Sequence, residues 1–185
     1  MPETAAKRSV PEPEAVVLPA APTFDAVYRE CFQHVWHTLR RLGVPDRDLE
    51  DSVHDVFVVV HRRLGDFDPT RPVRPWVTGI AYRVASDDRR RARRQREVLE
   101  DDVDAVDGGR GADEAIDAAR ARTRVHKALE TVPIDQRIVF VMHDIDGFAM
   151  PDIQRELAVP LNTLYSRLRL ARGKFEAAIR SQEPR

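Results

Sequence analysis

The sequence has 185 residues, of which 42% are hydrophobic, so it can bury a core and is not a chain that is disordered throughout. Its net charge of -1 conceals two basic blocks, residues 24–96 (15 Lys and Arg against 11 Asp and Glu) and 120–185 (12 against 8), around an acidic block, residues 97–119 (1 against 9). One cysteine excludes an intramolecular disulfide, and no run approaches the roughly 18 apolar residues that span a bilayer. We therefore expect a cytoplasmic protein without membrane insertion.

The first predicted helix follows an N-terminal extension. Residues 1–23 contain five of the thirteen prolines and few bulky apolar groups, so we expect them to be disordered, and they lack the pattern of an export signal. From Phe24 to Leu42 the apolar residues have the three- and four-residue spacing of one helix face. Gly43 follows, where a helix C-terminal cap is expected.

A second helix is predicted to begin near Asp46 or Asp48, because both carboxylates can cap free amides and favour the positive end of the helix dipole. Within it, the stretch "VFVVV" (56–60) is β-branched and by propensity alone favours a strand. The helical period continues on both sides of this stretch, however. The pattern therefore predicts a helix that ends at Gly65.

A third helix is predicted after the loop "DFDPTRPVRP" (66–75), which three prolines make stiff. Pro75 suits the first turn of a helix, and the buried side of this one begins at Trp76. The helix should continue into six arginines between Arg89 and Arg96.

The rest of the chain predicts a second helical unit. Residues 97–119 are expected to form an acidic flexible linker that becomes helical toward its end, followed by helices in residues 125–145 and a turn at Asp146 and Gly147. The stretches "MPDIQREL" and "NTLYSRLRLARGKFEAAI", joined by "AVP", close the pattern. No convincing strand remains, so the fold class is all-α, with two small helical domains.

The final two helices fit a helix-turn-helix, with Ile153 and Leu157 inward on the first and Leu164, Leu168 and Ala171 inward on the second. The opposite side of the second helix could donate hydrogen bonds to base edges and phosphates in a major groove. The plainer interpretation is an amphipathic C-terminal helix with a solvated basic face. The side chains on that face are Thr163, Tyr165, Ser166, Arg167, Arg169 and Arg172.

Three other patterns have functional and structural interpretations. Six arginines in eight residues repel one another unless anions neutralise them, so we favour a nucleic-acid contact over a solvated helix end. Asp48, Asp51 and Asp55 share one helix face, and without an accompanying nucleophile or ligand cluster they favour a partner-binding or solvated stripe over catalysis. Residues 31, 34 and 37 (Cys, His, His) resemble a metal spacing, but the outer two lie about 120° apart around a helix and cannot close one site.

Together these parts resemble the extracytoplasmic function (ECF) sigma factors of bacterial RNA polymerase, which belong to the sigma-70 family. The resemblance covers residues 24–96 and about 120–180. It rests on "DLEDSVHDVFVVVHRRLGDFDP", "RPWVTGIAYRVASDDRRRARR", "LETVPIDQRIVFVMHDIDGF" and "LNTLYSRLRLAR", in this order.

The resemblance implies a role for each segment. Residues 24–96 resemble sigma region 2, residues 97–119 the interdomain linker, and residues 120–182 sigma region 4. The helix with the acidic stripe resembles the surface that binds the polymerase core: Asp48, Glu50, Asp51, His54, Asp55 and Phe57. The following loop and helix resemble the element that captures the unwound minus-ten strand: Asp66, Phe67, Arg71, Arg74, Trp76, Arg83, Arg90, Arg91 and Arg94. The helix-turn-helix resembles the reader of the minus-thirty-five duplex: Asn162, Thr163, Tyr165, Ser166, Arg167, Arg169 and Arg172.

The resemblance therefore implies a promoter-specificity subunit that binds polymerase core, promoter DNA (duplex and melted strand) and an anti-sigma factor. It implies no catalytic activity, cofactor, metal or small-molecule substrate. Three alternatives predict other behaviour: a stand-alone helix-turn-helix regulator, an arginine-rich RNA-binding adaptor, and a metal-dependent enzyme that uses Cys31 and the histidines.

The chain departs from the family pattern at several positions. Ala149 stands where a capping serine is frequent, and Ala158 stands where a glycine commonly makes the turn. Asn162 and Tyr165 replace a frequent glycine and lysine, and His54 replaces a common glutamine. These differences affect the expected promoter sequence and not the fold.

Overall fold

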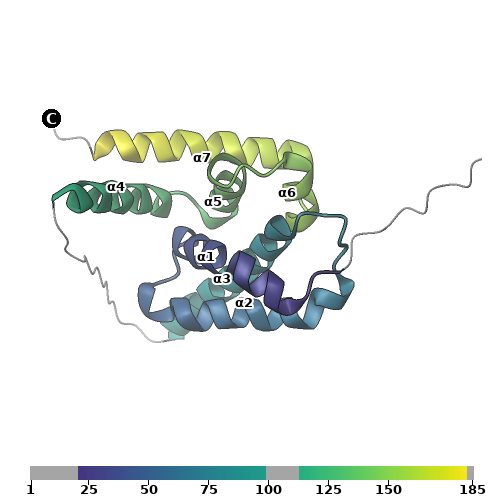
Figure 1. The fold of residues 1–185 in the computed structure, drawn as a ribbon. Helices are drawn as coiled ribbons and strands as arrows, with labels where there is room; N and C mark the ends of the chain where they lie inside the picture. Colours follow the sequence, from purple (N-terminus) through teal and green to yellow (C-terminus); the bar gives the residue numbers. More distant parts are fainter. Residues whose placement is uncertain (1–20, 99–112, 183–185) are drawn as a thin grey trace, which may run out of the picture.

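The computed structural model describes residues 21–98 and 113–182, and every regular element in these two ranges is helical (Figure 1). The predicted all-α class is confirmed. No helix in these ranges is both long enough and apolar enough to cross a membrane. The helices are α1 (Phe24–Leu42), α2 (Leu49–Arg63), α3 (Val73–Val98), α4 (Asp113–Glu130), α5 (Ile134–Phe140), α6 (Met150–Leu157) and α7 (Leu161–Ser181).

The first unit consists of α1, α2 and α3, which pack on one another around a shared apolar core. Thr23 caps α1 by accepting a hydrogen bond from the backbone N–H of Ala26, and Gly43 ends the helix in a left-handed conformation with φ 89°. The stretch "VFVVV" is helical, as predicted. It turns Val56, Phe57 and Val60 into the core, because burial in the helical period outweighs β propensity.

The predicted start of the second helix is confirmed, because a short 3-10 turn (Asp46–Asp48) leads directly into α2. The predicted capping is wrong, since neither aspartate accepts a side-chain capping bond there. Helix α2 ends at Arg63, two residues before the predicted end at Gly65. Gly65 instead lies within a second 3-10 turn (Leu64–Asp66). Pro75 lies in the first turn of α3, as predicted.

The second unit consists of α4 to α7. The predicted helical end of the linker is present, since α4 begins at Asp113, whereas residues 99–112 of the acidic linker and residues 1–20 of the extension lie outside the described ranges. After α5 the chain continues as a π-helical turn (Val141–Ile145). Helix α7 packs along α4 and α5, where the rings of Phe140 and Phe175 lie 5.0 Å apart (Figure 1).

The two units are in direct contact, and a buried arginine joins them. Arg137 of α5 is 1% exposed, and its guanidinium donates to the carbonyl oxygens of Leu42 (2.9 Å), Val132 (3.0 Å) and Glu130 (2.9 Å). It therefore binds the C-terminal end of α1 and the C-terminal end of α4 at once. Each of these helix ends has carbonyl groups without a partner inside its own helix, and a cation is favoured there.

Candidate functional site

The acidic stripe of α2 lies on the surface. Its five polar members project from one side of the helix and are exposed, because the opposite side buries Val53, Val56 and Val60. Phe57 is the exception, since it is 4% exposed and belongs to the core. The exposed members are Asp48, Glu50, Asp51, His54 and Asp55.

Beside this stripe, α1 and α2 enclose an aromatic groove of about 570 Å³. Tyr28 contributes the most exposed ring (40%), and its centroid lies 4.7 Å from that of Phe57. Large rings that stay partly exposed next to carboxylates form a surface suited to an apolar helix with basic flanks. The groove is lined by Phe24, Tyr28, Phe32, Trp36, Val53, Phe57 and Val58, with Glu50, His54, His61 and Arg62 at its polar rim.

In the loop after α2 and the start of α3, the aromatic side chains are buried and the charged side chains are exposed. Phe67 and Trp76 are both buried, with ring centroids 4.8 Å apart, so they pack against each other in this structure. Asp66 and Arg71 are exposed, and Arg71 pairs with Asp68 at 2.8 Å. The two aromatic residues predicted to contact DNA thus form the floor of the loop, and its charged residues form the rim.

Toward the end of α3, the side chains of Arg90, Arg91 and Arg94 are exposed to solvent. Arg90 and Arg91 lie near Asp87 (3.8 Å) and Asp88 (3.5 Å), one turn earlier on the same helix. Such exposed pairs contribute little to stability and exchange readily with other anions. Arg94, also exposed, donates to the carbonyl oxygen of Arg90 at 3.4 Å.

Helices α6 and α7 form the predicted helix-turn-helix. Ile153, Leu164, Leu168 and Ala171 are buried as predicted, and Leu157 is half-buried. The departures from the family pattern have structural consequences: Ala149 provides no side-chain cap for α6, and Ala158 adopts φ 54° at its end. On the outer side of α7, the side chains of Asn162, Thr163, Tyr165, Ser166 and Arg169 are exposed.

Two arginines predicted to contact duplex DNA also make bonds inside the second unit. Arg172 forms two hydrogen bonds of 2.7 Å with the carboxylate of Asp144, in the π-helical turn. Arg167 is half-buried and lies 3.4 Å from Asp135 at the start of α5. Hydrogen bonding to Asp144 raises the pKa of Arg172. These side chains attach α7 to α5 and the following turn. Fewer positive charges on α7 are therefore available to bind DNA phosphates than the number of its basic residues suggests.

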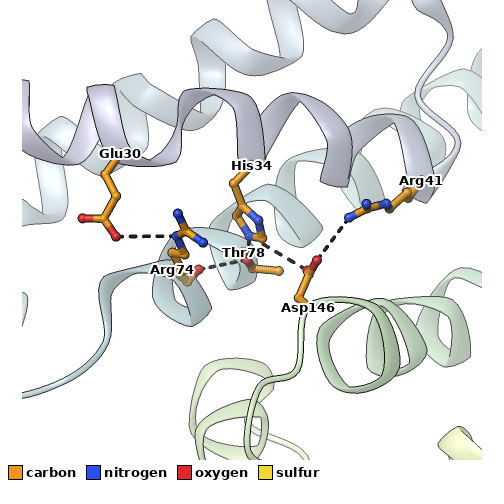
Figure 2. Close-up of polar contacts among 6 residues, drawn as sticks. All are labelled: Glu30, His34, Arg41, Arg74, Thr78 and Asp146. Carbon is orange, nitrogen blue, oxygen red and sulfur yellow. Dashed lines mark hydrogen bonds and ion pairs between the residues drawn. The ribbon is translucent and has the colours of Figure 1, made fainter.

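A polar seam where α1 and α3 meet the second unit was missed by the sequence analysis (Figure 2). Asp146, in the turn after α5, accepts a hydrogen bond from Arg41 of α1 at 3.1 Å and lies 4.0 Å from His34. His34 lies 2.7 Å from the hydroxyl of Thr78 on α3, and that hydroxyl donates to the carbonyl of Arg74. His34 is therefore the donor in its bond to Thr78, as a neutral ring protonated on Nε2.

Burial explains the protonation states in this seam. Together with the nearby charges of Arg74 and Arg41, it lowers the pKa of His34 to about 4. Burial also raises the pKa of Asp146, against the opposing effect of Arg41. Oδ2 of Asp146 is buried without a hydrogen-bond partner, so this carboxylate is incompletely compensated. At the edge of the seam, Arg74 pairs with Glu30 at 3.5 Å (Figure 2), which accounts for another residue predicted to bind DNA.

The sequence contains one indication that the two helical units are in contact. In "IDQRIVF" an arginine occupies the apolar phase of a short helix, directly before Ile138 and Val139, which are both buried. An arginine in that phase must find acceptors inside the fold. One of its acceptors, the carbonyl oxygen of Leu42 on α1, lies 95 residues away, so the pattern can flag the residue but cannot identify that contact.

The residues considered for metal binding do not converge. Cys31 is buried and burial raises its pKa to about 11, His34 faces Thr78, and His37 is exposed. Among the residues that the structure describes, no group of three or more His, Cys, Asp or Glu side chains could hold a metal ion.

Comparison with protein families places a match on each helical unit. The model of sigma-70 region 2 matches residues 27–95, and the model of sigma-70 region 4 matches residues 122–175. The first match covers α1 to α3 except for the first three residues of α1 and the last three residues of α3. The second begins midway along α4 and continues into α7.

Curated proteins show the same likeness over most of the chain. RNA polymerase sigma factor CnrH of Cupriavidus metallidurans is 30% identical over 149 residues, covering 76% of this chain and 78% of that protein. ECF RNA polymerase sigma factor SigM of Mycobacterium tuberculosis is 28% identical over 152 residues, covering 82% and 74%.

Two solved structures share the fold. The sigma factor RpoE of Bartonella quintana, solved in complex with the anti-sigma factor NepR, matches with a TM-score of 0.70 at 16% identity, covering 86% of this chain and 98% of that one. CnrH, solved with the cytosolic domain of CnrY, matches with a TM-score of 0.60 at 24% identity, covering 86% and 89%.

Proposed function

The chain belongs to the extracytoplasmic function sigma factors of the sigma-70 family. On that basis we propose which of its surfaces binds the polymerase core and which bind promoter DNA during transcription initiation. As a sigma factor it directs core RNA polymerase to specific promoters and assists DNA melting. The observation that carries the assignment is the order of the two matched regions, each on its own helical unit.

We propose domain limits of 24–96 for the core-binding and minus-ten unit and 120–182 for the minus-thirty-five unit, with 97–119 as linker and 1–23 as extension. The protein acts in the cytoplasm and has no catalytic activity of its own. RpoE was solved in complex with the anti-sigma factor NepR, and CnrH was solved in complex with the cytosolic domain of CnrY. By analogy we propose an anti-sigma partner for this chain.

The acidic stripe of α2 binds the polymerase core in this proposal. Its five exposed polar residues offer carboxylates to a basic partner, and the aromatic groove beside them offers apolar area. Charge complementarity sets orientation and encounter rate, whereas burial of the rings supplies most of the affinity. Phe57 acts as part of the groove wall and not as a free contact.

DNA contacts fall on both units. Arg90, Arg91 and Arg94 neutralise the backbone of the melted strand. The loop carrying Asp66 and Arg71, together with Arg74 in the first turn of α3, receives its bases. Asn162, Thr163, Tyr165 and Ser166 at the start of α7, together with Arg169, meet the duplex major groove. Arg167 and Arg172 contribute mainly by holding α7 in place, because each already has a carboxylate partner.

Charge reversal on α2 tests the core-binding assignment. Asp51→Arg with Asp55→Arg should reduce affinity for purified core polymerase roughly 30- to 1000-fold, because two repulsive contacts replace two attractive ones at about 1–2 kcal/mol each. The matched control is Asp25→Arg with Glu176→Arg, which makes the same change of charge at two exposed positions elsewhere. Binding is measured by fluorescence anisotropy of labelled protein, and folding by circular dichroism.

Equal affinities for the two charge-reversed proteins would refute the assignment of α2. The same samples also distinguish the other functions considered, since a stand-alone regulator binds duplex DNA tightly without polymerase. An RNA-binding adaptor would bind through residues 83–96 without help from residues 160–172.

A further inference from the structure

The aromatic groove between α1 and α2 starts at the first residue of α1. Phe24 lines the groove, and its ring centroid lies 5.2 Å from that of His61 near the end of α2. Tyr28, Phe32 and Trp36 follow at four-residue intervals along α1, so the row of rings extends over about three helical turns. Within residues 21–98 and 113–182 no side chain fills this space of about 570 Å³. The groove is therefore open to an apolar ligand.

The chain that leads into the groove carries one apolar run. Residues 1–20 precede the described range, and residue 20 is only four positions before Phe24. These twenty residues contain four valine and leucine residues, and three of them are consecutive: Val16, Val17 and Leu18. The run is therefore the part of the extension with the most apolar surface to bury.

The run is close enough to Phe24 to reach the rings. The chain has to reverse its direction before α1, and residues 19–22 supply the length and two prolines for such a turn. Leu18 lies six residues before Phe24, a reach of up to about 20 Å, whereas Phe24 and Tyr28 are about 6 Å apart along the helix. A tether this short gives an effective concentration on the order of 1 mM, so a weak intrinsic affinity is enough.

The charges of the extension give a partial match to the surface beside the groove. Traced backward from Leu18, the chain would pass along the groove toward the start of α2, because Phe24 lies at the other end of that helix. The exposed carboxylates of the acidic stripe begin there, and the basic pair at residues 7–8 can reach them. Glu12 and Glu14 lie between the run and this pair and weaken the match. Apolar contact therefore supplies most of the affinity.

We propose that residues 15–18 bind in the aromatic groove of the same chain and compete there with the polymerase core. The inference rests on the proposed core-binding function of α2 and the groove. It adds that the extension regulates this site, because only the fraction of protein with an open groove can bind. With an intrinsic Kd of about 0.1–0.5 mM and the effective concentration above, core affinity falls about three- to tenfold.

Fluorine NMR of the free protein tests the occupancy without polymerase. The full chain is labelled with fluorotyrosine, and the Tyr28 signal is assigned by its loss in Tyr28→Phe. The variant Val16→Ser with Val17→Ser and Leu18→Ser removes the run. Its Tyr28 signal should move toward the position of an exposed tyrosine, whereas that of Tyr165, which is 56% exposed in the second unit, should stay in place. An unmoved Tyr28 signal would show that the run does not occupy the groove.

Core binding tests the competition. The same variant should bind purified core polymerase about three- to tenfold more tightly than the parent, measured by anisotropy. The matched control places three serines elsewhere in the extension and should match the parent in both measurements: Ala5→Ser, Ala6→Ser and Val10→Ser. Equal core affinities for the two serine variants would overturn the competition.

Two further outcomes separate the alternatives. If dilution of the parent moves its Tyr28 signal to that of the run variant, the run binds the groove of a second copy and the intramolecular proposal is wrong. Failure of the proposed function is distinguishable, because Asp51→Arg with Asp55→Arg would then leave core affinity unchanged. The Tyr28 signal would still decide whether the run occupies the groove.

Discussion

The two helical units both present arginines to solvent, but they hold them in different ways. On α3, Arg90 and Arg91 pair with aspartates of their own helix at 3.8 and 3.5 Å. On α7, Arg172 bonds Asp144 twice at 2.7 Å across 28 residues of sequence. The first arrangement leaves cations available to a polyanion, and the second uses a cation to fix the position of a helix.

This difference implies a division of labour between the units. The end of α3 can exchange its weak local partners for phosphates at little cost. Helix α7 presents mostly neutral polar groups at its start, and its arginines position those groups. Strand capture should therefore depend strongly on salt, whereas duplex recognition should depend more on the shape and hydrogen bonds of α7.

The largest expected effect concerns the cations of α3. Replacing Arg90, Arg91 and Arg94 together by alanine should weaken binding of single-stranded DNA roughly 10- to 100-fold near 100 mM salt and reduce the salt slope by about 2. Stability to urea should stay within about 0.5 kcal/mol, because all three side chains are exposed. The measurement is a salt titration of DNA binding by anisotropy.

A matched triple variant sharpens that result. Arg29, Arg40 and Arg47 carry the same total charge and are also paired with nearby aspartates on the first unit. Their replacement by alanine should leave the salt slope nearly unchanged. Equal slopes for the two triple variants would mean that net charge alone governs DNA binding.

The sequence predicted the helices far better than the pairing of the arginines. Apolar period and turn residues located α1 and α6 closely, including the cap at Gly43, because these signals act between neighbours in the chain. An arginine on the exposed face of α7 has the same pattern whether it is solvated or bonded to Asp144. That choice depends on tertiary distance, which the pattern does not contain.

The position of the two units relative to each other was unpredictable for the same reason. Arg137 and Asp146 meet partners on α1 that lie about 100 residues earlier in the sequence, and the partners of Arg137 are backbone carbonyls that have no sequence signature. Phe67 and Trp76 show the converse. Phe67 was predicted in the loop and Trp76 on the buried side of the third helix, and the burial of Trp76 is confirmed. The resemblance implied that both contact DNA, whereas the structure packs the two rings against each other.

The second expected effect concerns the bond between Arg172 and Asp144. A double-mutant cycle of Arg172→Ala and Asp144→Ala should give a coupling energy of about 1–2 kcal/mol in urea unfolding, because a bidentate pair with a shielded carboxylate exceeds an ordinary surface pair. The reference cycle, Arg90→Ala with Asp87→Ala, should give less than about 0.5 kcal/mol. Similar coupling in both cycles would remove the distinction between positioning and available arginines.

The smallest expected effect lies in the turns that end α1 and α6. Both have a left-handed residue, but the first unit uses Gly43 at φ 89° and the second uses Ala158 at φ 54°. Ala158→Gly should raise the free energy of unfolding by about 0.5–1 kcal/mol, because glycine removes the left-handed strain of a Cβ and this gain exceeds its added chain entropy. Gly43→Ala should instead lower the free energy of unfolding by about 1–2 kcal/mol, since its Cβ would be strained and would lie 2.8 Å from Nη1 of Arg137. Urea denaturation of both variants gives the two signs, and a loss of stability in Ala158→Gly would show that the alanine turn is not strained.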